Sequence, residues 1–280
     1  ELIKLYNASS NMVMQGGVRR GASMGILNID HPEIMDFIHA KLDGGLTNFN
    51  LSVGVTNAFM EVLAQGGDWP LVFNGKVHDV LPAAELWQEI VKSAHACGDP
   101  GIIFLDTLQK SNPLPHKQLN CTNPCGEQPL FPGESCLLGS INLARLIGSN
   151  NRIDRAKLQE VVAIGVRFLD NLIDIAEYPL EMIAEATQAT RKIGLGFTGL
   201  ADALIWAGLP YDSDEGRRYA GEITKLIQQT ARETSRALAE EKGCFPEWEN
   251  SIYYPKIRNA TRVTIAPTGS VTTIAGCEGY

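Results

Sequence analysis

Short strand-like runs alternate along the chain with amphipathic helical stretches, and this alternation limits the folds that the sequence can adopt. A strand-like run is dense in β-branched or alternating apolar residues, whereas a helical stretch repeats its apolar residues every three or four positions. The strand-like runs are residues 24–29, 48–55, 102–105 and 262–266. The helical stretches are residues 33–41, 57–65, 81–97, 154–177 and 214–243. Because strands that alternate with helices usually form a sheet with helices packed against it, the sequence predicts an α/β fold.

The length and the charge of the chain exclude several classes of protein. With 280 residues, of which 44% are hydrophobic, the chain can bury a sizeable core, and we expect one domain over residues 1–280. The net charge of −8 disfavours a nucleic acid as partner. No apolar run approaches the roughly 20 residues that span a bilayer, and no secretory signal opens the sequence. We therefore expect no membrane partner and a cytoplasmic location.

Six cysteines occur in the chain, at positions 97, 121, 125, 136, 244 and 277. Without a secretory signal they argue against a disulfide scaffold and in favour of buried, metal-bound or catalytic thiols. Cys121 and Cys125 have a C-x3-C spacing, with Cys136 further along, so a zinc or iron–sulfur site stays open. No fourth ligand has a suitable spacing, and we assign no metal ligand.

The segment Asn123-Pro124-Cys125-Gly126-Glu127 combines three reactive side chains. Pro124 and Gly126 disfavour a helix there. In an extended segment side chains alternate, so Asn123, Cys125 and Glu127 would point to one side. The amide can hold a hydroxyl, the carboxylate can accept a hydroxyl proton, and the thiol can act as a nucleophile or carry a hydrogen atom. The alternative is a surface turn that contains a cysteine by chance.

A second segment has the features of a phosphate site. Residues 262–266 lead into Pro267-Thr268-Gly269-Ser270 and then into a helix start. Backbone N–H groups, hydroxyls and the helix dipole favour an anion at such a position. An ordinary helix cap explains the same residues.

A glycine-rich basic loop lies near the N-terminus. Arg19 and Arg20 stand among Gly16, Gly17 and Gly21. The two guanidinium groups could pair with the phosphate of an effector or a substrate, and a solvated basic turn is the alternative.

The residues around Cys125 resemble the active-site finger of ribonucleotide reductases. The resemblance covers residues 123–130, and the Pro-Cys-Gly-Glu form is similar to that of the adenosylcobalamin-dependent class II enzymes. Residues 16–27 resemble the loop and strand that link effector nucleotide to substrate choice in this family. Residues 266–270 resemble its substrate phosphate loop, and residues 139–143 also resemble the family. These matches follow the family's order over nearly the whole chain, which argues against coincidence.

The resemblance implies both a fold and a reaction. The fold would be part of the family's ten-stranded α/β barrel, incomplete in this chain, with a finger loop within residues 106–140 that enters the barrel. The reaction would be the reduction of ribonucleotides to 2′-deoxyribonucleotides by a thiyl-radical mechanism, with diphosphates favoured over triphosphates. Adenosylcobalamin would be the cofactor and would supply the radical chemistry.

The resemblance also implies roles for individual residues. Cys125 would carry the thiyl radical and abstract the 3′ hydrogen of the ribose. Glu127 would take the proton of the 3′ hydroxyl while Asn123 hydrogen-bonds the ribose hydroxyls. Cys136 would be one of two thiols that deliver reducing equivalents and end as a disulfide. The substrate phosphate would be bound by Pro267, Thr268, Gly269 and Ser270. The specificity loop would contain Gly16, Gly17, Arg19, Arg20 and Gly21.

The partners implied by the resemblance are a ribonucleotide substrate, a nucleoside or deoxynucleoside triphosphate effector, and a thioredoxin-type reductant that acts through a C-terminal tail. In the family the second reducing thiol precedes the position of Glu1, and the cysteine pair of the tail follows that of Tyr280. We therefore expect this chain to be a piece of a longer or split enzyme and to be inactive alone. A homodimer or a complementing fragment stays open as a protein partner.

Two other functions stay open. The first is a class I reductase chain, in which a partner subunit with a tyrosyl or metal radical would oxidise Cys125. The Pro-Cys-Gly-Glu form weighs against that class. The second is a nucleotide-binding fragment that keeps residues 268–270 and the loop around Arg19 but does not turn over.

Overall fold

The computed structural model describes residues 2–12, 14–15 and 19–277. Contacts divide the chain into two compact units. Unit 1 comprises Glu1–Asn112 and Gln118–Leu130, and unit 2 comprises Pro113–Lys117 and Phe131–Tyr280. This division does not test the expectation of one domain over residues 1–280, which stays a prediction.

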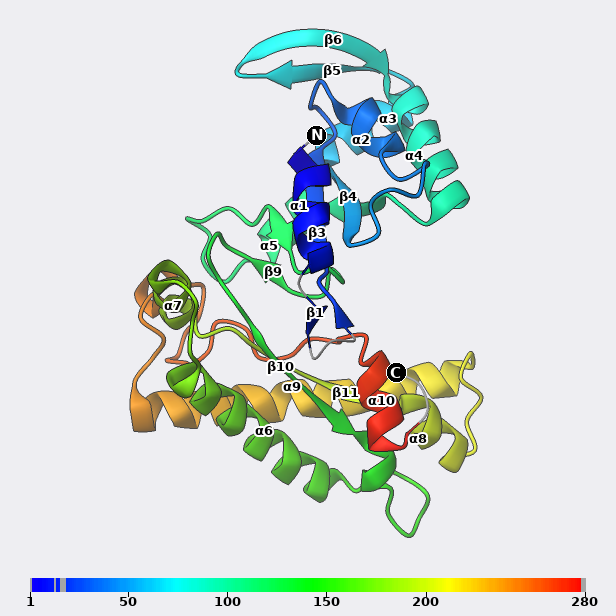
Figure 1. The fold of residues 1–280 in the computed structure, drawn as a ribbon. Coiled ribbons are helices and arrows are strands. Elements are labelled where there is room, and N and C mark those ends of the chain that lie inside the picture. The colour runs from blue at the N-terminus through cyan, green and yellow to red at the C-terminus, as the bar shows by residue number, and fades with distance from the viewer. Residues whose placement is uncertain (1, 13, 16–18, 278–280) are drawn as a thin grey trace. The chain divides into compact units, whose positions relative to one another are not determined.

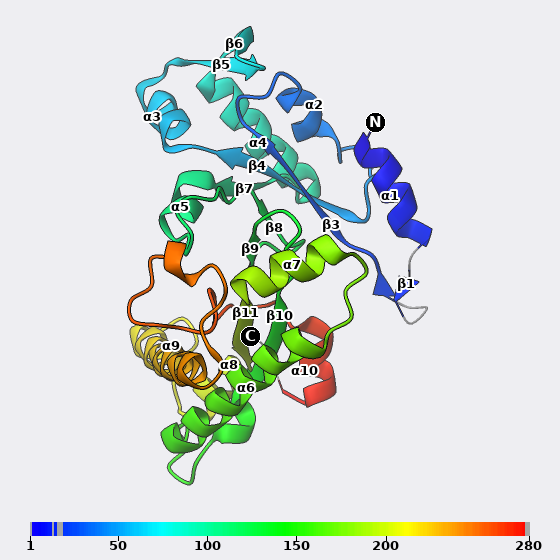
Figure 2. The same cartoon turned by 90° about the vertical axis from the view of Figure 1, so that its left-hand side faces the viewer.

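A three-stranded parallel sheet with the order β3-β4-β7 forms the centre of unit 1; Figure 1 labels β3 and β4, and Figure 2 labels all three strands. Its strands are β3 (Ser23–Asn28), β4 (Phe49–Val55) and β7 (Gly101–Phe104). Parallel neighbours require crossover connections, and helices lie in them here. The helices are α2 (Ile34–His39), α3 (Asn57–Gln65) and α4 (Ala83–Cys97). The strands and helices that the sequence predicts for this region are confirmed, apart from small differences at their ends.

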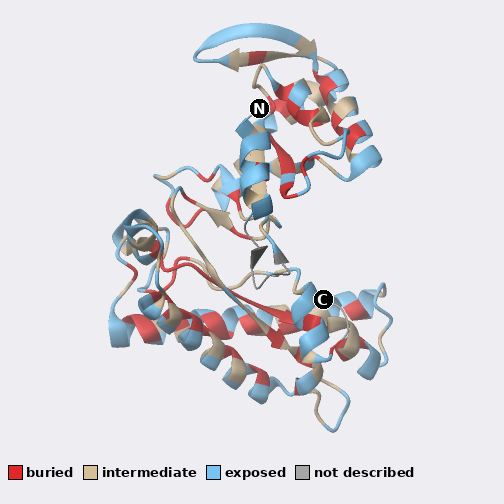
Figure 3. Ribbon diagram, in the orientation of Figure 1, coloured by how far each residue is buried: buried red, intermediate tan, exposed pale blue. Residues whose placement is uncertain are grey.

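Strand β4 carries the core of unit 1. Val53 and Val55 are fully buried, and they belong to the same apolar cluster as Phe59 of α3 and Ile90 of α4. Figure 3 shows the strand buried along most of its length. β4 is the central strand, paired with β3 on one edge and β7 on the other, and it is more buried than either neighbour.

Several elements of unit 1 are not predicted by the sequence patterns. They are α1 (Leu2–Met12), the antiparallel pair β1 (Met14–Gln15) and β2 (Arg19–Arg20), the hairpin β5 (Asp68–Phe73) and β6 (Lys76–Pro82), α5 (Leu105–Lys110), and the short strands β8 (Cys121–Thr122) and β9 (Pro129–Leu130). The turn of the β5–β6 hairpin is Asn74-Gly75, where both residues have positive φ angles, 50° and 73°. This dipeptide favours two-residue hairpin turns, so the sequence did contain a signal for the hairpin.

A parallel pair of strands, β10 (Leu137–Asn142) and β11 (Ile193–Thr198), lies at the centre of unit 2. The long helices α6 (Arg155–Ile175) and α9 (Asp214–Lys242) pack on each other, and α6 also packs on both strands (Figure 2). Both long helices confirm the sequence prediction. The other elements of unit 2 are the 3₁₀ helices η1 (Leu143–Leu146) and η2 (Trp248–Asn250), and the helices α7 (Glu181–Thr190), α8 (Leu200–Trp206) and α10 (Gly269–Ala275).

Strand β11 is buried at all of its positions, and a third segment crosses it closely. Leu195 forms a parallel bridge with Val263. A Cβ atom on Gly194 would lie 2.5 Å from the Thr264 side chain, and one on Gly196 would lie 2.3 Å from the Thr264 carbonyl oxygen. The predicted strand over residues 262–266 is wrong in its extent. Only Val263 forms a bridge to β11. Thr264 packs closely against Gly194 and Gly196, and no regular ladder of strand hydrogen bonds forms in this described segment.

The parallel strands and their helical connections confirm the α/β class. Figure 3 shows one largely buried strand in each unit, β4 in unit 1 and β11 in unit 2, together with helices that have exposed sides. None of the described helices combines the length and the apolar character that crossing a bilayer requires.

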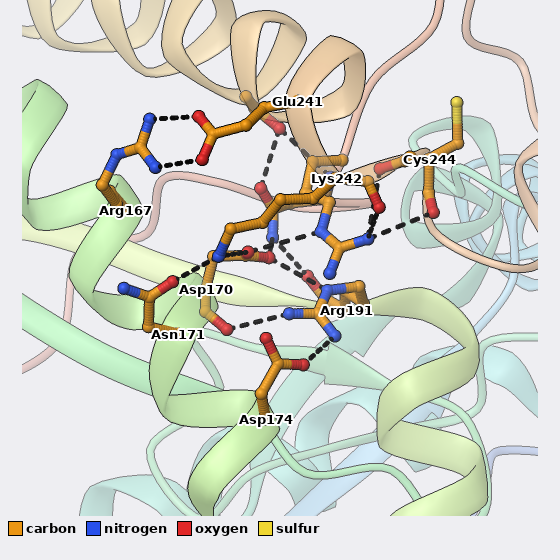
Figure 4. A network of polar contacts seen from close by, with 12 residues as sticks. Arg167, Asp170, Asn171, Asp174, Arg191, Glu241, Lys242 and Cys244 are labelled. Carbon is orange, nitrogen blue, oxygen red and sulfur yellow. Dashed lines mark hydrogen bonds and ion pairs between the residues drawn. The ribbon is translucent and has the colours of Figure 1, made fainter.

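A buried carboxylate, that of Asp170 on α6, joins several segments of unit 2 (Figure 4). Its side chain is fully buried and lies 2.9 Å from Arg191 Nε and 3.3 Å from Arg258 Nε. Asn259 Nδ2 donates a hydrogen bond of 2.9 Å to Asp170 Oδ1, and Lys242 Nζ at the end of α9 lies 3.8 Å from Oδ2. One carboxylate thus connects α6 with the end of α9, with Arg191 at the end of α7, and with Arg258 and Asn259, which precede the segment beside β11.

Arg191 ends α7 in a left-handed conformation with a φ of 47°. Such a conformation is strained for a bulky residue and persists where neighbours fix the side chain. Arg191 Nη1 lies 2.7 Å from Asp174 Oδ1. Burial raises the pKa of Asp174, but the hydrogen bond and the charge of Arg191 outweigh it and hold the pKa below its ordinary value. A lowered carboxyl pKa contributes stability above the unfolded pKa, and that contribution is lost as the pH falls through the folded pKa.

We predict that Asp170→Asn destabilises unit 2. The variant keeps the size of the side chain but leaves the guanidinium of Arg191, which is only 5% exposed, without this charged partner. Removal of one member of a buried ion pair costs about 3–5 kcal/mol, which equilibrium unfolding in urea measures.

Arg167→Gln is the matched control for this prediction. It breaks the Arg167–Glu241 pair on the same helix α6, where both side chains are about half exposed. Exposed pairs contribute little because water screens them, so the loss of stability should be much smaller. Equal losses in the two variants would contradict the structural role of Asp170.

Candidate active site

The segment around Cys125 is the turn of a short hairpin in unit 1. Strands β8 and β9 pair antiparallel, with Cys121 opposite Leu130. The Gly126 amide donates a hydrogen bond of 3.0 Å to the Asn123 carbonyl, which closes a four-residue turn with Pro124 at its second position. Proline is favoured at the second position of such a turn and glycine at the fourth. The amino-acid order around Cys125 therefore explains the turn.

The turn corrects the expectation of an extended segment with alternating side chains. Gly126 has a φ of 84°, outside the extended region, so the alternation argument does not apply to this segment. The turn leaves the Cys125 thiol exposed, whereas Asn123 and Glu127 are half-buried on either side of it. Asn123 and Cys125 therefore lie within the turn, and Glu127 directly follows it.

Asn123 fixes the base of this turn. Its Oδ1 accepts a hydrogen bond of 2.9 Å from the Gln128 amide, and its own amide donates to the Gln128 carbonyl at 3.2 Å. Gln128 is buried, at 3% exposed. Both the backbone and the side chain of Asn123 are thus held by one buried neighbour, which limits the motion of the turn.

A strand of the central sheet of unit 1 also holds the turn. Asn50 Nδ2 on β4 donates a hydrogen bond of 2.6 Å to the Pro124 carbonyl. Asn50 is the exposed position in an otherwise buried strand. The sequence analysis missed this residue, although a polar side chain between Phe49 and Leu51 in an apolar run is a visible signal.

Cys136 lies in unit 2, directly before β10, and is half-buried. Lys192, directly before β11, forms a buried ion pair with Glu134, with 2.6 Å between Nζ and Oε2. The sequence analysis singled out neither Glu134 nor Lys192, because residues 58 positions apart give no local pattern.

The predicted phosphate loop precedes α10 in unit 2. Thr268 has a left-handed φ of 47°, and its carbonyl accepts a hydrogen bond of 2.8 Å from the Thr272 amide. Thr268 Oγ1 is buried and has no hydrogen-bond partner among the described residues. Pro267, Gly269 and Ser270 are exposed. The helix start predicted after this loop is confirmed, and a buried hydroxyl with free hydrogen-bonding capacity is suited to a ligand.

The predicted specificity loop is described only in part. Gly16 and Gly17 lie outside the described residues. Arg19 and Arg20 form strand β2, in which Arg20 is opposite Met14 and is exposed, and the half-buried Gly21 follows.

All six cysteines lie within the described residues, and none of them is in a disulfide. Among the described residues, no group of three or more histidine, cysteine, aspartate or glutamate side chains is arranged to hold a metal ion.

Comparison with known protein families identifies the chain. The family model of the ribonucleotide reductase barrel domain matches residues 1–257. This chain belongs to the ribonucleotide reductase family. The predicted resemblance and the barrel class of the fold are confirmed, and the parallel strands of the two units represent only part of such a barrel.

Individual relatives of this ribonucleotide reductase chain are similar over most of its length. A vitamin B12-dependent ribonucleoside-diphosphate reductase from Mycobacterium tuberculosis is 48% identical over 98% of the chain. A protein of the same name from Thermoplasma acidophilum is 43% identical over 99% of the chain. A vitamin B12-dependent ribonucleotide reductase from Streptomyces coelicolor is 33% identical over 83% of the chain. The chain spans 40% of the length of the first of these relatives, 37% of the second and 27% of the third.

We predict that Gly126→Ala destabilises this ribonucleotide reductase chain by about 1–2 kcal/mol, the cost of a left-handed conformation for a residue with a Cβ atom. No atom lies within 4 Å of the position of that Cβ, so the cost arises from the backbone alone. Urea unfolding measures the change.

The matched control is Gly221→Ala on α9, where a Cβ also meets nothing within 4 Å but the backbone is helical. Alanine should stabilise that position by roughly 1 kcal/mol. A Gly126→Ala variant as stable as the parent protein would rule out the strained turn.

Proposed function

We propose that this chain is the catalytic barrel part of an adenosylcobalamin-dependent ribonucleotide reductase that converts ribonucleoside diphosphates to 2′-deoxyribonucleoside diphosphates. The observation that carries the proposal is the exposed Cys125 on a fixed turn between Asn123 and Glu127. The names of the relatives support the cofactor and the diphosphate substrate.

Cys125 is the residue that acts on the ribose in this proposal. As a thiyl radical it takes the 3′ hydrogen atom, so that the S–H bond forms as the C–H bond breaks and the unpaired electron moves to the 3′ carbon. An exposed thiol suits this role because a substrate carbon must approach the sulfur directly. Ordinary acid–base groups cannot abstract hydrogen from such a carbon.

Glu127 and Asn123 handle the hydroxyl groups in this proposal. Glu127 accepts the proton of the 3′ hydroxyl and acts as a general base. Asn123 Oδ1 is already bound to the Gln128 amide, so its Nδ2 group is the donor that a ribose hydroxyl would meet. The 2′ hydroxyl takes up a proton from the reducing thiol pair that includes Cys136 and leaves as water.

Cys136 and the loop Pro267, Thr268, Gly269 and Ser270, all in unit 2, have further roles in this proposal. Cys136 is one of two thiols that are oxidised to a disulfide as the nucleotide is reduced. The Thr268 hydroxyl, buried without a hydrogen-bond partner among the described residues, together with Gly269 and Ser270 binds the substrate phosphate.

The exposed Cys125 sulfur fits the proposed cofactor, because a bulky group can reach it without displacing a core side chain. When bound, adenosylcobalamin supplies the homolytic cobalt–carbon bond cleavage from which the radical on the protein derives. The contribution of this chain is to hold the thiol, the carboxylate and the amide in place.

The remaining partners belong to the whole enzyme. A nucleoside triphosphate effector would act through the loop of Gly16, Gly17, Arg19, Arg20 and Gly21. A thioredoxin-type reductant would regenerate the thiols, and a second copy or a complementing fragment would complete the assembly in the cytoplasm. The class I alternative, with a radical from a partner subunit, is disfavoured by the names of the relatives.

The test of the proposal is anaerobic exchange of tritium from the 5′ carbon of adenosylcobalamin into water, with nucleotide and effector present, in the intact protein that contains this chain. We expect exchange in the parent protein and none in Cys125→Ala, because the thiol is the group that exchanges hydrogen with the cofactor.

Cys97→Ala is the matched control, since Cys97 is another exposed thiol of unit 1, at the end of α4, and should leave exchange unchanged. No exchange in a folded parent protein would reject the cobalamin assignment and favour a partner-generated radical or a binding-only fragment. Exchange that persists in Cys125→Ala would reject the role of this thiol.

We predict that Glu127→Gln lowers the turnover number by about 10²–10⁴-fold, the contribution typical of a general base. Tritium exchange should persist in this variant because exchange requires Cys125 and not the base. Glu61→Gln, exposed on α3, is the control and should retain full turnover. Full turnover in Glu127→Gln would assign the proton to another group.

A further inference from the structure

A buried ion pair lies at the start of the strand pair in unit 2. The Lys192 ammonium and the Glu134 carboxylate are 2.6 Å apart, and each side chain is only 1% exposed. Removal of two charges from water is costly, and a buried pair is weak evidence for stability alone. The proposed reaction leaves both groups without a role.

The protein surrounds the carboxylate with donors. Thr190 Oγ1 donates to Glu134 Oε1 at 2.5 Å, and the Phe131 amide donates to Oε2 at 2.5 Å. The Lys192 ammonium lies 4.0 Å from the centre of the Phe131 ring, in the position of a cation–π contact. These contacts fix the location of both charges.

The strand register brings Cys136 to this pair. Strands β10 and β11 are parallel, and their register begins with Leu137 opposite Ile193. Cys136 and Lys192 each directly precede the first paired residue of their strand, where neighbouring strands lie about 4.8 Å apart. Glu134 lies two positions before Cys136 in the same segment.

The electrostatics agree with this placement. The pKa of Lys192 lies below its ordinary value because burial outweighs Glu134 and the thiolate form of Cys136, which both raise it, and the charge of Lys117 lowers it further. Interaction between two titrating groups is mutual, so an ammonium that is stabilised by the thiolate stabilises that thiolate in return.

We propose that Lys192 is a positioning residue for Cys136: its ammonium, fixed by Glu134, favours the thiolate of this cysteine. The inference rests on the proposed role of Cys136 as a reducing thiol and deepens it. The step is an acid–base one, in which the S–H proton passes to water and no electrons are transferred.

The benefit concerns the disulfide that Cys136 forms in each cycle. A disulfide is reduced by thiolate attack, and a sulfur with a lower pKa leaves faster. Lys192 therefore makes Cys136 the better leaving group when the reductant attacks its partner sulfur. The charge of position 192, rather than its shape, is the property that matters.

The test is the pH dependence of alkylation at Cys136 in the intact, reduced protein, with iodoacetamide as the probe and peptide mass spectrometry to separate the cysteines. The midpoint is the pH at which the alkylation rate of a cysteine is half its maximum. In the parent protein the midpoint of Cys136 should lie below that of the exposed Cys97 and below the ordinary thiol pKa of about 8.5. Lys192→Met should raise the midpoint, and each unit of increase lowers the thiolate fraction about tenfold at a given pH below it.

Lys192→Arg keeps the charge and should keep the midpoint, while Lys157→Met, an exposed site on α6, is the control for loss of a lysine charge in general. A purely structural role for Lys192 would change exposure and thus the rate at every pH, but not the midpoint.

An unchanged midpoint in a folded Lys192→Met protein would overturn the proposal. If that variant does not fold, a parent midpoint for Cys136 at or above that of Cys97 overturns it, and a lower one supports it. Alkylation needs neither cofactor nor substrate, so this result is independent of the tritium exchange that tests the proposed function.

Discussion

The close packing of backbone against strand β11 is the constraint on which the candidate site of unit 2 depends. β10 pairs with this strand in parallel register, and the segment at Val263 crosses it where Gly194 and Gly196 leave no room for a Cβ. The pairing of β10 with β11 sets the position of Cys136. The packing of the Val263 segment on β11 sets the start of the segment that runs to the phosphate loop. Asp170 of α6 then contacts Arg191, which precedes β11, and Asn259, which precedes the Val263 segment, so that both segments are joined to a long helix of unit 2.

In unit 1 the candidate reactive side chain is positioned by a turn and not by the register of paired strands. Cys125 is placed by a turn that its neighbours close, with a proline, a glycine with positive φ and the hydrogen bonds of Asn123. Precision therefore comes from local backbone geometry in unit 1 and from strand register in unit 2. If Cys125 is the radical thiol of the proposed function, an exposed turn gives the substrate access to it, and if Cys136 is a reducing thiol, the strand pair holds it in a fixed position.

The sequence predicts the parts of this fold that have local causes. The helices α6 and α9 have amphipathic spacing and capping side chains, Asp154 and Ser213, that accept hydrogen bonds from the first turn. Strand β11 is missed because Gly194 and Gly196 resemble loop residues, whereas their actual cause is a neighbour about 70 positions away. The side-chain chemistry of Asn123, Cys125 and Glu127 predicts a reactive segment and the resemblance implies their roles, but a turn takes the place of the expected extended geometry. The Lys192–Glu134 pair gives no periodic signal, so only the folded chain reveals it.

The left-handed backbone of Thr268 has a consequence for how this enzyme can drift over evolutionary time. Glycine or asparagine would relax that conformation, and either would be an easy replacement if only folding mattered. Threonine retains the strain and, in addition, a buried hydroxyl that finds no hydrogen-bond partner among the described residues. Folding alone would therefore favour drift toward glycine or asparagine at this position. In the proposed function, the contact of the threonine hydroxyl with the substrate phosphate is what would oppose that drift.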